Sequence, residues 1–250
     1  LRELGAAAGV GFLPVRRVGA AVAGIVEDVA YRFPLLAGRH REGDVAAAQK
    51  KWDAAVDAYR QGLQVSPAPL LATKIHSALS ASGKLAEAGT FAAVWLKEKP
   101  KDIGFRLYLG SEAGARGDFA TAERMYASVV EIQPDYAVGL NNLAWVTGKL
   151  GKEGAIALAE KAVALDPQQA AFMDTLAMLL SQKNDYARAL EWQNKALALQ
   201  PQTDLYRLNL AKIHIQGGKR DLARKELDAL ATLGDKFKGQ AEVTSLLKTL

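Results

Sequence analysis

The sequence has no cysteine, so neither a disulfide framework nor a thiolate metal site can form. Histidine is also scarce, because His40, His76 and His214 are the only three and lie far apart along the chain. A metal site needs ligands that converge within about 2 Å of one ion. No HExxH motif or other paired-histidine spacing occurs, so we expect no metal site and no cofactor.

The usual signatures of an enzyme are missing as well. No GxSxG motif occurs, and the segment GKLGK from Gly148 lacks the GxxxxGK[ST] spacing of a phosphate-binding loop. Arg116-Gly117-Asp118 spells a cell-adhesion tripeptide, but Gly117 better fits a turn between helices and Asp118 a helix cap. We therefore predict a protein without enzymatic activity and without catalytic residues.

Aromatic residues make up only 7% of the chain and alanine dominates its apolar residues, which indicates thin, closely packed helices. The formal charge of +5 comes from 32 basic and 27 acidic residues that alternate along the chain. The densest basic stretch, from Lys219 to Lys225, is broken by Asp221. Because a nucleic-acid binder clusters its positive charge, we expect no nucleic acid among the partners.

No apolar run is long enough to span a bilayer. The segment VGAAVAGIV after Arg16-Arg17 is similar to a short signal core but ends at Glu27-Asp28. We expect it to form part of a buried helix, and we expect no transmembrane or targeting segment in this chain. The chain begins at Leu1 without methionine, and we expect it to be a fragment or a processed form.

Two series of residues recur at a nearly constant interval. Six of the eight prolines are 33, 33, 34, 33 and 34 residues apart: Pro34, Pro67, Pro100, Pro134, Pro167 and Pro201. Midway between them lie Gly83, Gly117, Gly151, Asn184 and Gly218. Proline marks a helix end, while glycine and asparagine tolerate the left-handed conformation that closes a helix. The pattern predicts a repeat of about 34 residues that consists of a helix, a tight turn and a second helix stopped by proline.

Small residues hold fixed places within each repeat. Alanine comes early in each second helix: Ala55, Ala88, Ala122, Ala155, Ala189 and Ala223. A small residue lies in the middle of most first helices: Gly43, Gly110, Ala144, Ala177 and Ala211, whereas the second repeat has His76. Close approach of helices requires small side chains, and we predict that Tyr59, Tyr126 and Leu227 fill the gaps between hairpins. The fourth repeat is atypical, because its spacing from Gly151 to Ala155 is one residue shorter than in the others.

This pattern resembles the tetratricopeptide (TPR) repeat. Positions of the family pattern are Leu143-Ala144, Ala155, Ala162 and Pro167 in one copy, and Leu176-Ala177, Ala189, Ala196 and Pro201 in the next. Trp95 and Gln193 depart from it, standing where small and apolar residues are usual. The resemblance implies an all-α fold, a right-handed α-α superhelix or TPR-like solenoid of about six helical hairpins with a C-terminal capping helix. We predict a degraded or truncated repeat over residues 1–35, the repeat array over 36–234 and the capping helix over 235–250.

The C-terminal half has a narrower resemblance. The segments LNNLAWVTGKLG, ALAEKAVALDP, AAFMDTLAMLLSQ and GDKFKGQAEVTSLLKTL follow one another in this order. They resemble the C-terminal portion of the PEP-CTERM-system TPR-repeat lipoproteins, exported bacterial proteins encoded with exosortase and exopolysaccharide machinery. This resemblance implies a protein–protein interaction scaffold in envelope exopolysaccharide assembly or PEP-CTERM protein sorting. It also implies a periplasmic or outer-membrane-associated location.

In TPR-like stacks the first helices line the concave face, and their outward residues are expected to meet a protein or peptide partner. The candidates are Arg41, Lys74, Tyr108, Asn141, Asn142, Trp145, Asp174, Thr175, Met178, Asn209 and Lys212. Asparagine can hydrogen-bond a peptide backbone, and Trp145 and Tyr108 offer apolar area at low entropic cost. Trp145 also fits a packing role. The Lys, Asn and Arg positions of a carboxylate clamp are matched only piecemeal, so we predict no clamp.

Two further functions are compatible with the same fold. One is a cytoplasmic TPR co-chaperone or assembly factor, which the sequence upstream of Leu1 in the full gene would distinguish from an exported protein. The other is direct polysaccharide binding, with exposed Trp95, Trp145 and Trp192 as stacking platforms. Quenching of tryptophan fluorescence by exopolysaccharide would support that alternative.

Overall fold

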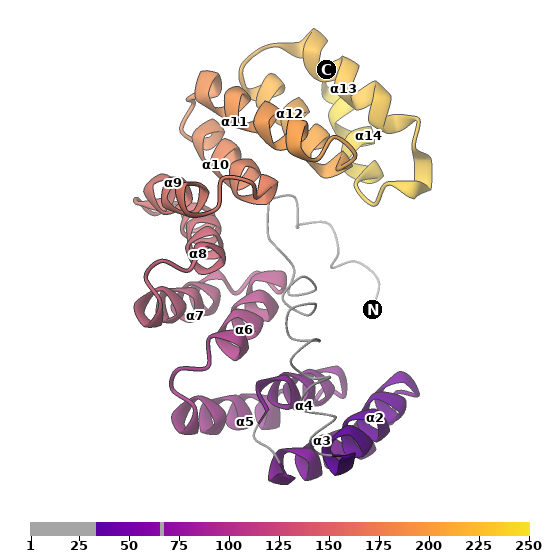
Figure 1. Ribbon diagram of the computed structural model, residues 1–250. Coiled ribbons are helices and arrows are strands. Elements are labelled where there is room, and N and C mark those ends of the chain that lie inside the picture. The colour runs from indigo at the N-terminus through magenta and orange to yellow at the C-terminus, as the bar shows by residue number, and fades with distance from the viewer. Residues whose placement is uncertain (1–33, 66–67) are drawn as a thin grey trace. The chain divides into compact units, whose positions relative to one another are not determined.

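The computed structural model describes residues 34–65 and 68–250, and these residues form α-helices joined by short turns (Figure 1). The chain divides into two compact units between Leu109 and Gly110. We call residues 34–109 the N-terminal unit and residues 110–250 the C-terminal unit, and describe each by itself. The truncated repeat and the buried apolar helix predicted for residues 1–33 lie outside the described residues.

The N-terminal unit contains two hairpins and the start of a third. Its helices are α2 (Pro34–Ala48), α3 (Trp52–Val65), α4 (Pro69–Ala81), α5 (Leu85–Glu98) and the first part of α6 (Ile103–Ala115). Apolar side chains pack between neighbouring hairpins: Tyr59 of α3 packs with Leu71 and Ile75 of α4, and Trp95 of α5 packs with Phe105 of α6.

The C-terminal unit continues the same alternation from the end of α6. Its helices are α7 (Phe119–Ile132), α8 (Ala137–Lys149), α9 (Ala155–Leu165), α10 (Ala170–Gln182), α11 (Tyr186–Leu199), α12 (Asp204–Gln216), α13 (Arg220–Ala231) and α14 (Gln240–Thr249). A short 3-10 helix, Gly234–Lys236, precedes α14. Helices α2 to α13 form six hairpins, so the predicted all-α hairpin repeat is confirmed. None of the described helices is long and apolar enough to cross a membrane.

The turn residues adopt the left-handed conformation that the sequence predicts. The backbone φ angle is 81° at Gly83, 77° at Gly117, 67° at Gly151, 63° at Asn184 and 72° at Gly218. After each one, the next amide donates to a carbonyl five residues earlier, as from Lys219 N to His214 O at 2.8 Å. In the first hairpin Lys50 takes this place with φ 57°, although no glycine marks the turn.

Four of the prolines predicted to end helices do so in the described residues. Pro100, Pro134, Pro167 and Pro201 each follow the last residue of a second helix by two positions. Pro34 is instead the first residue of α2, a position that proline tolerates because the first turn needs no amide donor. Pro67 and any helix that ends before Pro34 lie outside the described residues.

Tyrosine rings fill the space that glycine leaves in two hairpins, one in each unit. A Cβ atom added to Gly43 would lie 2.2 Å from Tyr59 Cε1, and one added to Gly110 would lie 2.6 Å from Tyr126 Cε1. Both rings are buried. We predicted that these tyrosines fill gaps between hairpins, but the gap that each ring fills beside its glycine lies within one hairpin. Tyr59 in addition packs with Leu71 and Ile75 of the next hairpin.

The two tyrosines differ at their hydroxyl groups, and this difference predicts opposite results for the same substitution. Tyr59 Oη donates to Asp44 Oδ1 at 2.7 Å, whereas the buried Tyr126 hydroxyl has no hydrogen-bond partner in the described chain. Tyr59→Phe is expected to lower the free energy of unfolding by about 1 kcal/mol, because a bond to a carboxylate is lost. Tyr126→Phe is expected to leave it unchanged or raise it. Urea unfolding followed by circular dichroism measures the stability of both variants. Equal losses would contradict the difference in hydrogen bonding between the two hydroxyl groups.

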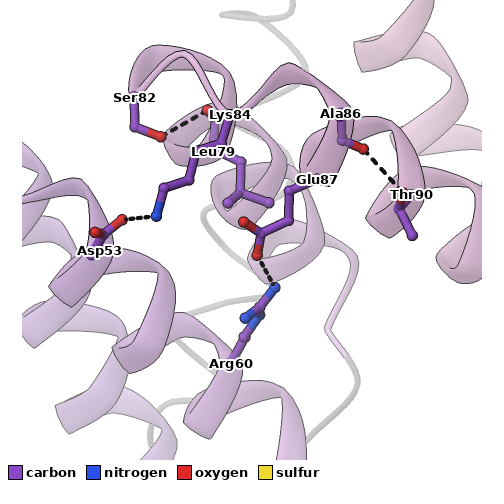
Figure 2. A network of polar contacts seen from close by, with 8 residues as sticks. All are labelled: Asp53, Arg60, Leu79, Ser82, Lys84, Ala86, Glu87 and Thr90. Carbon is purple, nitrogen blue, oxygen red and sulfur yellow. Dashed lines mark hydrogen bonds and ion pairs between the residues drawn. The ribbon is translucent and has the colours of Figure 1, made fainter.

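Exposed ion pairs join the second helices of neighbouring hairpins. Figure 2 shows Arg60 Nη2 beside Glu87 Oε1 at 2.8 Å and Lys84 Nζ beside Asp53 Oδ1 at 2.6 Å. In the C-terminal unit Arg188 and Glu160 pair at 2.6 Å, at the same repeat positions as Glu87 and Arg60 but with the charges exchanged. Each exposed pair contributes about 0.2–1 kcal/mol, so these contacts orient hairpins more than they stabilise them.

The last helix covers the end of the C-terminal unit. Val243 of α14 is buried in a cluster with Leu208 of α12 and with Leu227 and Leu230 of α13. A terminal hairpin of a repeat array needs such a cover, because one of its faces has no neighbouring repeat. The domain boundaries at residues 35 and 235 remain predictions.

Candidate partner-binding face

The predicted site residues of the C-terminal unit lie on three first helices, and α8 contacts α10, which contacts α12. These residues are Asn141, Asn142 and Trp145 on α8, Asp174, Thr175 and Met178 on α10, and Asn209 and Lys212 on α12. The repeat period places Asn142, Thr175 and Asn209 in one row, and Trp145, Met178 and Lys212 in a second row. We call these two rows, with the residue one turn further along each helix, the first-helix face.

Most of these side chains are buried. Asn141, Asp174, Thr175 and Asn209 are 0% exposed, and Asn142, Trp145 and Met178 are at most 6% exposed. The expectation that these side chains point outward from the packed helices toward a partner therefore does not hold. Their contribution to partner binding stays a prediction, and the accessible chemistry of the face must come from other side chains.

Three of the buried polar groups form one hydrogen-bond network across α10, α11 and α12. Gln193 Nε2 donates to Asp174 Oδ1 at 2.7 Å and to the Tyr206 carbonyl at 2.8 Å. Asn209 Nδ2 donates to Asp174 Oδ1 and Oδ2 at 2.9 and 3.1 Å. Gln193 stands where the repeat pattern usually has an apolar residue, and here it supplies a donor to this buried carboxylate.

Trp145 takes the packing role that the sequence left open. Its ring meets Phe119 edge to face at 5.7 Å between centroids, and Lys149 Nζ lies 5.9 Å from its centroid. Trp95 is also buried, and its Nε1 donates to Asp102 Oδ2 at 2.8 Å. Neither ring therefore offers an open face for sugar stacking, which removes two of the three platforms that direct polysaccharide binding requires.

The predicted site residues of the N-terminal unit have different surroundings. Arg41 is exposed, whereas Lys74 forms an ion pair with Asp44. Burial raises the pKa of the Asp44 carboxyl, but the hydrogen bond from Lys74 leads the opposing effects and the pKa lies below its usual value. Tyr108 is buried, with its hydroxyl 2.9 Å from His76 Nδ1. Of the three candidates, Arg41 is the one that offers an open charge.

Two lysines of the first-helix face, Lys149 and Lys212, interact electrostatically with each other and with a carboxylate of α14. Lys212 Nζ lies 2.6 Å from Glu242 Oε1 of α14. Burial lowers the pKa of the half-buried Lys149 ammonium, and the charge of Lys212 lowers it further, while Glu242 opposes both effects. The face thus carries more positive than negative charge at this point. Lys149 was not predicted, although its position one helical turn after Trp145 places it on the same side of α8.

A second feature was not predicted as a site. An open cavity of about 640 Å³ lies between the turn of the α8–α9 hairpin, residues 148–157, and the end of α10 at Leu179, Gln182 and Lys183. We call it the turn cavity. Its sequence signal is the short spacing from Gly151 to Ala155. In the described residues no group of three or more acidic or histidine side chains could hold a metal ion.

The hairpin formed by α10 and α11 matches a known repeat family. Residues 170–203 match the family model of the tetratricopeptide repeat. This match covers one hairpin with its proline stop, and the other TPR-like hairpins repeat its turn geometry. No curated protein matches the chain.

Solved structures show the same TPR-like fold over most of the chain. A tetratricopeptide repeat protein from Parabacteroides merdae ATCC 43184 has a TM-score of 0.71 at 15% identity, covering 86% of each chain. Pseudomonas aeruginosa pilF has a TM-score of 0.62 at 15% identity, covering 86% of this chain and 98% of its own. YrrB, described as a TPR protein with an unusual peptide-binding site, has a TM-score of 0.54 at 15% identity, covering 76% and 100%. At these identities the likeness shows the fold alone.

Proposed function

We propose that this chain is a non-enzymatic scaffold that binds a partner protein on the first-helix face of its C-terminal unit. Packed hairpins hold such a surface rigid, so little ordering entropy opposes docking. The observation that carries the proposal is the ion pair of Lys212 with Glu242, whose two charges both act on the ammonium of Lys149 from another helix. The partner segment would place an acidic side chain beside these lysines.

We further propose that the partner belongs to bacterial envelope machinery, in exopolysaccharide assembly or PEP-CTERM protein sorting. The support is the order of the C-terminal segments, which resembles the exported lipoproteins of that system. A peptide-binding role is in keeping with YrrB, whose description names a peptide-binding site. Fractionation of cells that express the full tagged gene tests this location, and recovery in the cytoplasm alone would favour the co-chaperone alternative.

The binding face is tested by charge reversal at Lys149 and Lys212 together. The purified chain would capture proteins from a native envelope extract, with mass spectrometry quantifying each recovered protein. We expect Lys149→Glu with Lys212→Glu to lower recovery of the specific partner at least tenfold, because its acidic segment would be repelled.

The matched control reverses two exposed lysines, the α13 N-cap Lys219 and Lys225 of α13, by Lys219→Glu with Lys225→Glu, which gives the same net charge. This control should recover the partner as the unaltered chain does. Equal losses in both variants would indicate a nonspecific charge effect, and unchanged recovery in the first variant would exclude the face.

A further inference from the structure

The turn cavity exists because one hairpin lacks the first turn of its second helix. Helices α7 and α11 begin at Phe119 and Tyr186, three residues before the alanines Ala122 and Ala189. Helix α9 begins at its alanine, Ala155, after a second left-handed glycine, Gly154, with φ 85°. The shortened spacing therefore removes three helical positions, including the one that the two aromatic residues hold.

In the flanking hairpins that aromatic residue packs against the next hairpin. The Phe119 ring meets Trp145 of α8 edge to face, with 5.7 Å between centroids. Tyr186 lies against the end of α12, where a Cβ atom added to Gly217 would be 3.4 Å from Tyr186 Cγ. The chain itself thus shows which kind of side chain occupies this position between successive hairpins.

The walls of the turn cavity correspond to those two contacts. Lys183 directly precedes the left-handed Asn184, just as Gly217 directly precedes the left-handed Gly218. The opposite wall is formed by Gly148 and the first turn of α9. Leu179 packs against Gly148, since a Cβ atom added to Gly148 would lie 2.2 Å from Leu179 Cδ2. The cavity is lined by Leu179, Ile156 and small residues together with charged and polar side chains, including Lys152 and Glu153. None of these lining residues is aromatic, although the corresponding position of the flanking hairpins holds Phe119 or Tyr186.

We propose that the turn cavity binds a phenylalanine or tyrosine side chain of a partner protein. Its volume of about 640 Å³ lies within the range of about 300–1,000 Å³ of ligand pockets. The bound ring replaces the residue that Phe119 and Tyr186 supply in the flanking hairpins, and rests on Leu179 and the α9 wall. The ion pair of Glu160 with Arg188, at 2.6 Å, borders the cavity. The cavity adjoins the first-helix face at Gln182, but neither Lys149 nor Lys212 lines it, so the two proposals can be tested separately.

The test titrates the ¹⁵N-labelled chain with N-acetyl-phenylalanine amide and N-acetyl-tyrosine amide, and follows the amide signals of Gly148, Gly151 and Gly154. We expect saturable shifts of these signals, with N-acetyl-leucine amide binding at least fivefold more weakly because it lacks the flat ring. Ala157→Phe fills the cavity from the exposed side of α9 and is expected to weaken binding at least tenfold.

Ala120→Phe is the matched control, since Ala120 is an exposed alanine of α7 outside the cavity. It should bind the aromatic amides as the unaltered chain does, and so should the Lys149→Glu, Lys212→Glu variant. The proposal is overturned if the glycine signals do not move, if the leucine amide binds equally well, or if Ala157→Phe leaves binding unchanged. None of these results affects the first-helix face.

Discussion

Asn209→Leu is expected to lower the free energy of unfolding by about 3 kcal/mol, because a buried carboxylate loses the donor that contacts both its oxygens. Asn209 Nδ2 lies 2.9 and 3.1 Å from the two oxygens of Asp174, and both residues are 0% exposed. Leucine fills a similar volume, so the loss reports the polar contact and not a cavity. Urea unfolding followed by circular dichroism at neutral pH measures the change.

The matched control is Asn194→Leu, the same substitution at an exposed position of α11. It is expected to change stability by no more than about 0.5 kcal/mol. The double variant Asp174→Leu with Asn209→Leu should cost less than the sum of the single variants, since the carboxylate that needs the donor is gone. Strict additivity would show that the network is not a unit.

Gly110→Ala is expected to lower the free energy of unfolding by about 2 kcal/mol, against the usual helical preference for alanine. The new Cβ atom would lie 2.6 Å from Cε1 of Tyr126, a ring that is 0% exposed and has no space to move into. In the sixth hairpin the corresponding positions hold a larger residue than glycine and a smaller one than tyrosine, namely Ala211 and Leu227. Both are buried. Tyr126→Leu in the Gly110→Ala background is therefore expected to restore part of the loss.

Denaturant unfolding of the two single variants and the double variant measures this coupling, which should be at least about 1 kcal/mol. Gly89→Ala serves as the control, because a Cβ atom there meets nothing within 4 Å. At that exposed helical position alanine is expected to stabilise the chain by about 0.5–1 kcal/mol. A stabilising Gly110→Ala would show that the tyrosine ring yields without cost.

For the predicted site residues, the sequence indicates their helices but not their burial. The repeat period correctly placed Asn142, Thr175 and Asn209 on consecutive first helices. It could not show that these side chains are buried, because burial depends on side chains from other helices. The donor that Asp174 receives from Gln193 is 19 residues away, and the one from Asn209 is 35 residues away. Glu242 was not predicted for the same reason, since it belongs to α14 and meets Lys212 of α12 only in the folded chain.

The sequence by itself determined the hairpin period, the turn residues and the helix stops. These depend on the backbone preferences of Gly83, Asn184 or Pro134 within a few residues of each, so they can be recognised without knowing the rest of the chain. Only the tertiary structure decided the buried network at Asp174 and the turn cavity beside α9. Both depend on how the side chains of neighbouring hairpins pack against one another. At the cavity, the spacing from Gly151 to Ala155 is one residue shorter than in the other hairpins, and this changes which space between helices the side chains fill.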